Sequence, residues 1–386
     1  MNTALKHWRE AATLILAAGH RLGDGLPGRT APLVSGRGGL RPPRHRRFDY
    51  DVLMLQRSGK SGFMPNAYVF PGGVVDCSDF SSDWLEVFKP FVDSPNFGLR
   101  HVEQPIESRP PIFATDRLKL GSAVPGEVAL RICALRETFE ESGVLLVVSK
   151  REKGLLKSFE ETWGGQHYTE DELSGAELTK WRALVNQNPS NFVQMCRELE
   201  VLPNIWALHE WANWLTPIKK YGATRFDTAF FMCCLQDIPH TLQDEREIEG
   251  FQWSTPSEIL RSYQDRQLWI APPQFYELSR MCRFTSLTDL HRFTHQRATE
   301  GCEQFTPVVV FKDEQYVSLL PGDKQYPKDN SEQTGAEKNP DTDSALHRIL
   351  ISDPYTTTLQ ITITPKYNHL LPVEEPGLSH DVNGQL

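Results

Sequence analysis

The chain has 386 residues, of which 39% are hydrophobic and 24% are charged, and its formal net charge is −9. This length allows one large domain or two ordinary ones, and the negative charge argues against nucleic-acid binding as the main function. No run approaches the ~18 apolar residues of a membrane span. The seven cysteines form no CxxC pair, so neither a zinc site nor a disulfide framework is predicted, and a reducing compartment is favoured.

The N-terminal 48 residues carry nine Lys and Arg against two acidic residues, which is typical of a mitochondrial transit peptide. A structural interpretation competes with this one. Apolar runs at 11–19 and 49–58 flank a Gly-, Pro- and Arg-rich segment, as two paired strands would. We favour the strands, in which case cleavage within this region would remove part of the fold.

Residues 49–76 predict a strand, a loop and a second strand, and 77–125 predict irregular structure with one short helix. A helix follows from about Glu127 to Ser142, because apolar residues recur there at helical spacing, and Gly143 is expected to end it. A strand is predicted at 144–149. The apolar residues of the helix are Val128, Ile132, Leu135 and Phe139.

The second half of the chain predicts helices between 151 and 200, then two strands of a meander at 208–217 and 224–235. A helix is expected to open at Thr255 or Ser257. The remaining predictions are helices at 272–284 and 287–298, a hairpin at 306–322, a flexible polar loop at 322–345 and late strands at 348–354 and 359–365.

The predicted helix at 127–142 gathers carboxylates on one face. Glu140 and Glu141 lie three and four residues after Glu137, so all three project on neighbouring rows, whereas Phe139 lies about 200° away from Glu137. Like charges at this spacing destabilise a bare helix by a few tenths of a kcal/mol per pair, roughly, and a hard cation such as Mg²⁺ would offset that repulsion. The alternative is a solvated face with one ion pair between Arg136 and Glu140.

The pattern Arg136-Glu137-x-x-Glu140-Glu141-x-Gly143-apolar resembles the second half of the Nudix box, written GX5EX7REUXEEXGU. The Nudix family cleaves a nucleoside diphosphate linked to another moiety. The nearby segment "GSAVPGE" (121–127) does not match the first half, because the position eight before Arg136 is Val128.

The segment "YVFPGGVVD" (68–76) resembles the start of that box. Its glycines, Gly72 and Gly73, allow the backbone to turn tightly and approach a ligand. We therefore predict a box split by an insertion near 77–125 that loops outward and leaves both halves in contact. Lengthening a loop costs only ~0.6 kcal/mol per doubling, so an insertion of this length is tolerable.

The preceding segment, 53–73, is similar to the one before the box in coenzyme A diphosphatases. A generic strand-loop-strand with surface Arg57 and Lys60 is the alternative. The matching positions are Leu53, Leu55, Arg57, Ser58, Lys60, Pro65, Phe70, Pro71, Gly72 and Gly73.

The resemblance implies an α+β fold, a Nudix α/β/α sandwich with a mixed β-sheet, an insertion inside the box and a helical and C-terminal extension. We assign 1–265 to the Nudix domain, with insertions at about 77–125 and 151–200. Residues 266–321 would form a helical and hairpin extension packed on it, 322–345 a flexible loop, and 346–386 C-terminal strands and a tail. Nothing in the sequence predicts the oligomeric state.

The implied reaction is the attack of water on the diphosphate of CoA or acyl-CoA, giving adenosine 3′,5′-bisphosphate and (acyl-)4′-phosphopantetheine. Mg²⁺ or Mn²⁺ would neutralise the diphosphate and lower the pKa of the attacking water. The assigned metal ligands are Glu137, Glu140, Glu141 and the Gly72 carbonyl, and Arg136 would orient the carboxylates. Glu137 is also assigned a catalytic role.

A later loop often supplies one more carboxylate in this family. The candidates are Asp244, Glu245, Glu247 and Glu249, of which we favour Glu245 or Glu247; a solvated acidic turn is the alternative. The residues assigned to substrate binding are Arg57, Ser58, Lys60, Phe70, Gly72 and Gly73, with Lys219 or Lys220 as further partners of the 3′-phosphate. The hydrophobic run 269–275 and the insertion near 77–125 are candidates for the acyl or pantetheine pocket, against the alternative that such a hydrophobic turn is core.

Three other functions compete. One is a Nudix hydrolase for ADP-ribose or NADH, and another is a catalytically silent Nudix-fold binding module, which the intact Arg136, Glu137, Glu140 and Glu141 argue against. A Ser-His acyl hydrolase is disfavoured because no GxSxG motif is present. The resemblance implies a peroxisomal location, with a mitochondrial one as the alternative. The last residue, Leu386, suits a Ser-Lys-Leu type signal, whereas Gly384 and Gln385 do not.

Overall fold

The N-terminal apolar run forms the central strand of the main sheet. In the computed structural model, which describes residues 8–20, 47–62, 64–150, 175–217, 224–243, 247–327 and 344–374, this strand is β1 (Arg9–Gly19). It pairs parallel with β8 (Phe226–Leu235) and antiparallel with β2 (Tyr50–Arg57). All three strands are largely buried, as strands in the middle of a covered sheet must be. The strands predicted at 11–19 and 49–58 are confirmed.

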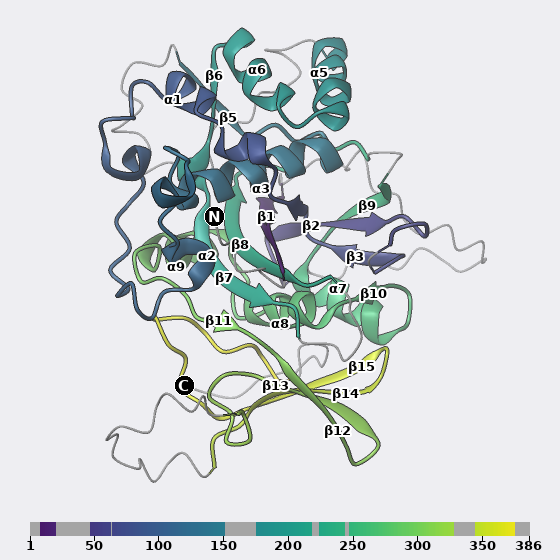
Figure 1. Ribbon diagram of the computed structural model, residues 1–386. Helices are drawn as coiled ribbons and strands as arrows, with labels where there is room; N and C mark the ends of the chain where they lie inside the picture. The colour runs from purple at the N-terminus through teal and green to yellow at the C-terminus, as the bar shows by residue number, and fades with distance from the viewer. Residues whose placement is uncertain are drawn as a thin grey trace, which may run out of the picture.

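The main sheet is mixed and has the order β10-β3-β2-β1-β8-β7-β11, as Figure 1 shows. Two further strands join it: β4 pairs with the first half of β1, and β9 pairs with β2. The predicted meander is confirmed, since β7 and β8 pair antiparallel. The remaining strands are β3 (Ala67–Val69), β4 (Gly72–Val74), β7 (His209–Leu215), β9 (Ile248–Ser254), β10 (Trp269–Ile270) and β11 (Gln304–Phe305).

Helices cover both faces of this sheet. Along β1, Leu14 and Leu16 join the core that contains α3 (Gly126–Ser142), whereas Ile15 and Ala17 join the core on the opposite face. This alternation follows from the two-residue period of a strand. The second core contains α7 (Pro256–Gln264) and α8 (Pro272–Met281), and α9 (Leu287–Gln296) packs there against β8 and β7. The predicted α/β/α sandwich is therefore confirmed.

The segment between β4 and α3 folds into short helical pieces on the α3 side of the sheet. Its aromatic residues anchor it: Trp84 packs against Phe192, and Phe91 packs against Trp206. The pieces are η1 (Cys77–Phe80), α1 (Asp83–Val87), η2 (Pro95–Gly98), α2 (Pro111–Ala114) and η3 (Leu118–Leu120). Beside them lie β5 (Val147–Ser149), α5 (Gly175–Gln187), α6 (Asn191–Glu198), β6 (Val201–Pro203) and η4 (Ile205–Ala207).

A second, antiparallel sheet lies below the sandwich in Figure 1, with the order β12-β13-β14-β15. The predicted hairpin at 306–322 and the late strands form both of its halves, and β13 joins β14 between them. The hairpin was assigned above to the extension 266–321 and the late strands to the segment 346–386. In the structure both belong to one sheet. The strands are β12 (Val308–Lys312), β13 (Gln315–Leu319), β14 (His347–Asp353) and β15 (Thr356–Ile361).

Some predictions lie outside the described residues, among them most of the loop at 322–345, the basic segment 21–46 and the end of the chain from 375 to 386. Strand β9 was not predicted, because "GFQW" was interpreted only as the approach to the following helix. That helix, α7, does begin after a Thr255 cap. None of the helices in the described part of the chain has the length and hydrophobicity of a bilayer-spanning segment.

Candidate active site

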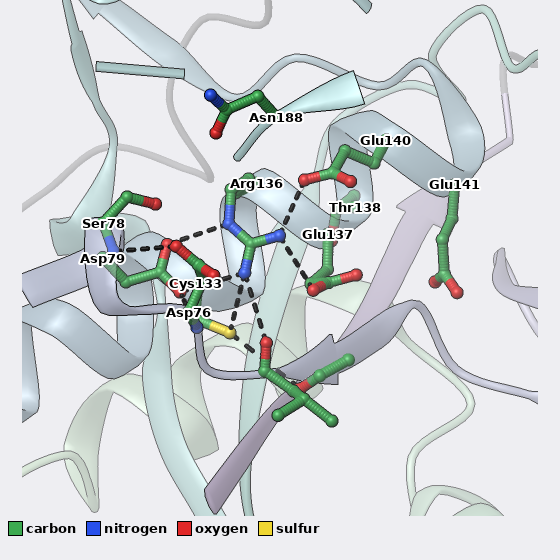
Figure 2. A network of polar contacts seen from close by, with 12 residues as sticks. Asp76, Ser78, Asp79, Cys133, Arg136, Glu137, Thr138, Glu140, Glu141 and Asn188 are labelled. Atoms are coloured by element: carbon green, nitrogen blue, oxygen red, sulfur yellow. Dashed lines mark hydrogen bonds and ion pairs between the residues drawn. The ribbon is translucent and has the colours of Figure 1, made fainter. Parts of the chain in front are cut away.

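Arg136 lies at the centre of a buried network on α3. Its side chain is 1% exposed and donates to both carboxylate oxygens of Asp79, at 2.8 and 2.9 Å. It also donates to Glu137 at 2.8 Å and to Glu140 at 2.7 Å, as Figure 2 shows. Burial by itself would lower the pKa of Arg136, but the Asp79 carboxylate raises it well above the ordinary value. The guanidinium is therefore a fixed cation that holds three carboxylates.

Asp79 is a site residue that the sequence analysis missed. It follows Gly73 by six positions, which is the spacing of the first glutamate in the pattern GX5E. A capping box presents it, because Asp76 accepts from the Ser78 amide and the Asp79 carboxylate accepts from the Asp76 amide at 2.9 Å. The insertion therefore begins after Asp79 and not at 77. Counting forward from Gly73 and allowing Asp for Glu would have found this residue.

The two glycines touch the acidic helix, as the split-box hypothesis predicts. A Cβ on Gly73 would overlap the Glu137 carboxylate, and one on Gly72 would overlap β1 at Ala12 and Thr13. Gly72 has a φ of +154°, and its amide donates to Glu141 at 2.9 Å across 69 positions of sequence. Only glycine fits both positions, which explains how strand β4 approaches α3 so closely.

The glutamates of α3 carry more negative charge than nearby cations balance. Burial raises the pKa of Glu140 to about 7, and repulsion from Glu137 adds to this effect. Burial likewise raises the pKa of Glu137, and it raises that of Glu141 well above the ordinary value. The charge of Glu247 adds to the upward pKa shift at both Glu137 and Glu141, so Glu247 lies close enough to act on the helix.

This donor set fits a divalent cation. Carboxylate oxygens are the ligands that Mg²⁺ and Mn²⁺ take in proteins. A cation would offset both the burial that mainly raises these pKa values and the repulsion between the carboxylates. In the described ranges no three His, Cys, Asp or Glu side chains already surround a common point. Figure 2 shows Glu137 and Glu140 turned to Arg136 and Glu141 projecting apart from them. The carboxylates would therefore have to turn to share an ion.

The end of β2 brings several predicted substrate residues to this helix. Arg57 donates to the Ser61 hydroxyl at 2.9 Å, and its charge lowers the otherwise raised pKa of Glu141. The Ser58 amide donates to the Glu247 carbonyl at 2.7 Å, and the Ser58 hydroxyl donates to Glu249 at 2.9 Å. The exposed Lys60 follows in the same loop. Glu247 and Glu249 thus flank the loop that begins at Arg57.

Other predicted site residues lie elsewhere. Phe70 is 2% exposed and packs edge-to-face against Phe230 in the core on the far side of the sheet, so its side chain serves packing. The run 269–275 forms β10 and the start of α8 in that same core, which favours the core alternative over an acyl pocket. Asp244, Glu245, Lys219 and Lys220 lie outside the described residues.

Comparisons with known proteins identify the family to which this chain is similar. Residues 8–281 match the family model described as the NUDT19 Nudix domain, and residues 309–362 match the NUDT19 C-terminal domain. The chain is 45% identical to the acyl-coenzyme A diphosphatase NUDT19 of Xenopus laevis, over 97% of each chain. It is 39% identical to the protein of that name from Homo sapiens, over 95% of this chain and 94% of the other. A NUDIX hydrolase crystal structure from Alicyclobacillus acidocaldarius covers 74% of this chain and 96% of its own, with 19% identity and a TM-score of 0.47.

Proposed function

Because this chain belongs to the NUDT19 family of Nudix hydrolases, we propose that it hydrolyses the diphosphate of CoA and acyl-CoA esters. The products are adenosine 3′,5′-bisphosphate and (acyl-)4′-phosphopantetheine. The observation that carries the proposal is the contact of Gly72 and Gly73 with the glutamates of α3. The named activity of the relatives supplies the substrate class.

The α3 carboxylates and the Gly72 carbonyl would hold a divalent cation, Mg²⁺ or Mn²⁺. When bound, such an ion neutralises diphosphate charge and lowers the pKa of a bound water by several units. The protein's own part is to position these ligands. Asp79 fixes Arg136, and Arg136 in turn holds Glu137 and Glu140. A side chain held by a second, buried partner loses little further freedom when the substrate binds.

We assign the remaining polar groups to two roles, the activation of water and the binding of the substrate phosphates. Glu247 is the described late-loop carboxylate whose charge reaches Glu137 and Glu141, so we assign it as the general base or as an added ligand. Arg57 lies at the same end of the site and Lys60 follows it in the loop, and both would attract the phosphates of CoA.

A substrate comparison tests the proposed class. With Mg²⁺ present, product release is measured from CoA, an acyl-CoA, ADP-ribose and NADH at equal concentration. We expect CoA and acyl-CoA to be cleaved to adenosine 3′,5′-bisphosphate, with the other two cleaved far more slowly. Cleavage of ADP-ribose with CoA untouched would show that a different diphosphate is the substrate.

Glu137→Gln tests the metal site. It removes one carboxylate charge beside Gly73 and keeps the side-chain volume, so we expect kcat to fall about 10³-fold with an unchanged circular dichroism spectrum. Glu86→Gln is the control, because Glu86 is 79% exposed and pairs only with Arg197 among the described residues. Wild-type turnover in Glu137→Gln would remove Glu137 from the catalytic site.

A further inference from the structure

The segment 57–61 at the end of β2 carries the two cations, Arg57 and Lys60, that we assign to the substrate phosphates. The Ser61 amide closes this loop, because it donates to the Ser58 carbonyl at 2.9 Å. Arg57 is folded onto the Ser61 hydroxyl at 2.9 Å, and Lys60 is exposed. A charge on a loop is positioned precisely only where other groups hold that loop. The question is therefore which residue holds the backbone around Lys60.

The side chain of Glu249, on the neighbouring strand β9, holds this segment. Its Oε1 atom accepts from the Ser58 hydroxyl at 2.9 Å and from the Gly59 amide at 3.1 Å. The Ser58 hydroxyl in turn accepts from the Lys60 amide at 3.3 Å. Ser58 is buried, whereas Glu249 and Lys60 are exposed. The backbone of residues 59 and 60 is thus tied to one carboxylate oxygen, either directly or through one hydroxyl.

Glu247 and Glu249 act on different groups although one residue separates them. The charge of Glu247 acts on Glu137 and Glu141 of α3, and its backbone carbonyl accepts from the Ser58 amide at 2.7 Å. The carboxylate of Glu249 is used at the loop instead. A negative charge beside a phosphate-binding segment repels the phosphates. The two hydrogen bonds that Glu249 accepts give a physical reason for a carboxylate at this position in spite of that repulsion.

We propose that Glu249 is a positioning residue for substrate binding, which holds the segment 57–61 so that Lys60 meets the substrate phosphates. This inference rests on the proposed function, since it takes Lys60 as a phosphate-binding residue. A group that only positions a binding cation acts on the bound substrate and on the transition state alike, so its loss raises KM and leaves kcat unchanged. Glu247 differs, because a general base or metal ligand acts in the reaction itself and its loss lowers kcat.

Steady-state kinetics with CoA on two variants of the full chain separate positioning from charge. Glu249→Ala and Glu249→Gln both remove the negative charge, but glutamine keeps an oxygen that accepts from Ser58 and Gly59. We expect Glu249→Ala to raise KM about tenfold at unchanged kcat, because charged hydrogen bonds are lost, and Glu249→Gln to stay within about twofold of wild type. Glu86→Ala is the control, since Glu86 is 79% exposed. An unchanged or lower KM in Glu249→Ala, or an equal rise in both variants, overturns the proposal.

A double-mutant cycle shows whether Glu249 acts through Lys60. Lys60→Gln alone should raise KM, and adding Glu249→Ala should raise it by less than about twofold more, because the ammonium group to be positioned is gone. In the matched control, Glu249→Ala combined with Lys89→Gln, at an exposed lysine, should show the full tenfold rise, roughly. Independent losses at Glu249 and Lys60 would overturn this inference alone, whereas a wild type that cleaves no CoA would overturn the proposed function first.

Discussion

Both faces of the main sheet bury ionisable groups, a cluster of glutamates beside α3 and Arg297 and His347 on the opposite face. On the α3 face, burial raises the pKa values of Glu137, Glu140 and Glu141. On the other face, burial lowers the pKa of Arg297 to about 10 and that of His347 to about 4. The cause is the same on both faces, since a low-dielectric interior disfavours whichever form is charged.

The difference lies in how each charge is supported. Arg136 has three carboxylate partners, and the negative charge that remains is gathered beside two glycines that let a backbone approach. Arg297 donates to two backbone carbonyls and lies over the Trp211 ring, with its guanidinium carbon 5.9 Å from the ring centroid. The surplus of buried negative charge beside α3 thus indicates that the missing ligand there is a cation.

The largest effect is expected for Asp79→Ala, which removes a partner of Arg136 in the acidic cluster on α3. It leaves Arg136 buried with only partial compensation, and losing one partner of a buried pair costs about 3–5 kcal/mol. We expect urea unfolding to show that loss together with a fall in activity. Asp83→Ala is the control, because Asp83 is 53% exposed in its pair with Arg197 and exposed pairs are worth under ~1 kcal/mol. Equal losses in the two variants would show that Asp79 does not anchor the site.

The second largest effect is expected at low pH, where protonation of His347 on the face opposite α3 should destabilise the folded state. His347 accepts from the Tyr276 hydroxyl at Nε2 and donates to the Pro321 carbonyl at Nδ1, an arrangement that suits the neutral ring. Its folded-state pKa of about 4 lies below the ordinary 6.5, mainly through burial, with Arg280 adding to the effect. The folded state therefore binds fewer protons than the unfolded state between these values. The contribution of the neutral His347 ring to the free energy of unfolding is fully present above pH 6.5 and is lost as the pH falls to 4.

Urea unfolding at several pH values measures this contribution. Wild type should lose on the order of 3 kcal/mol more than His347→Gln between pH 6.5 and 4. His101→Gln, at an exposed position, should keep the wild-type dependence. Parallel curves for wild type and His347→Gln would show that this histidine is not held neutral by the fold.

The smallest effect is expected for Gly73→Ala, which tests whether Glu137 acts from its position beside Gly73. Its methyl group would occupy the space of the Glu137 carboxylate and push that side chain away. Misplacing a catalytic group by about 1 Å costs on the order of 10²-fold in rate, equivalent to about 2.7 kcal/mol. Gly62→Ala is the control, because nothing lies within 4 Å of a Cβ there. Full activity in Gly73→Ala would mean that Glu137 does not work from the position seen here.

Much of the site was predictable because its pattern is local. The spacing of Glu137, Glu140 and Glu141 follows from the helical period, and Val128, Ile132, Leu135 and Phe139 are all buried as their stripe predicts. The contact with Gly72 and Gly73 was also predicted, through a resemblance to a known motif. Asp79 was missed although its spacing from Gly73 was available, because the insertion was assumed to begin before it.

The sequence by itself determined most of the strands and helices of the sandwich and the acidic face of α3, since these depend on periodicity, and the resemblance to a known motif indicated that the box is split into two halves. Only the tertiary structure decided which charges meet. Arg136 reaches Asp79 across 57 positions, the charge of Glu247 acts on Glu137 and Glu141, and Arg297 donates to the Glu210 carbonyl. Likewise, β13 and β14 pair in one sheet although β13 ends at Leu319 and β14 begins only at His347. Contacts of this kind depend on loop closure and on how the two faces of a sheet are covered, and neither leaves a periodic trace in the sequence.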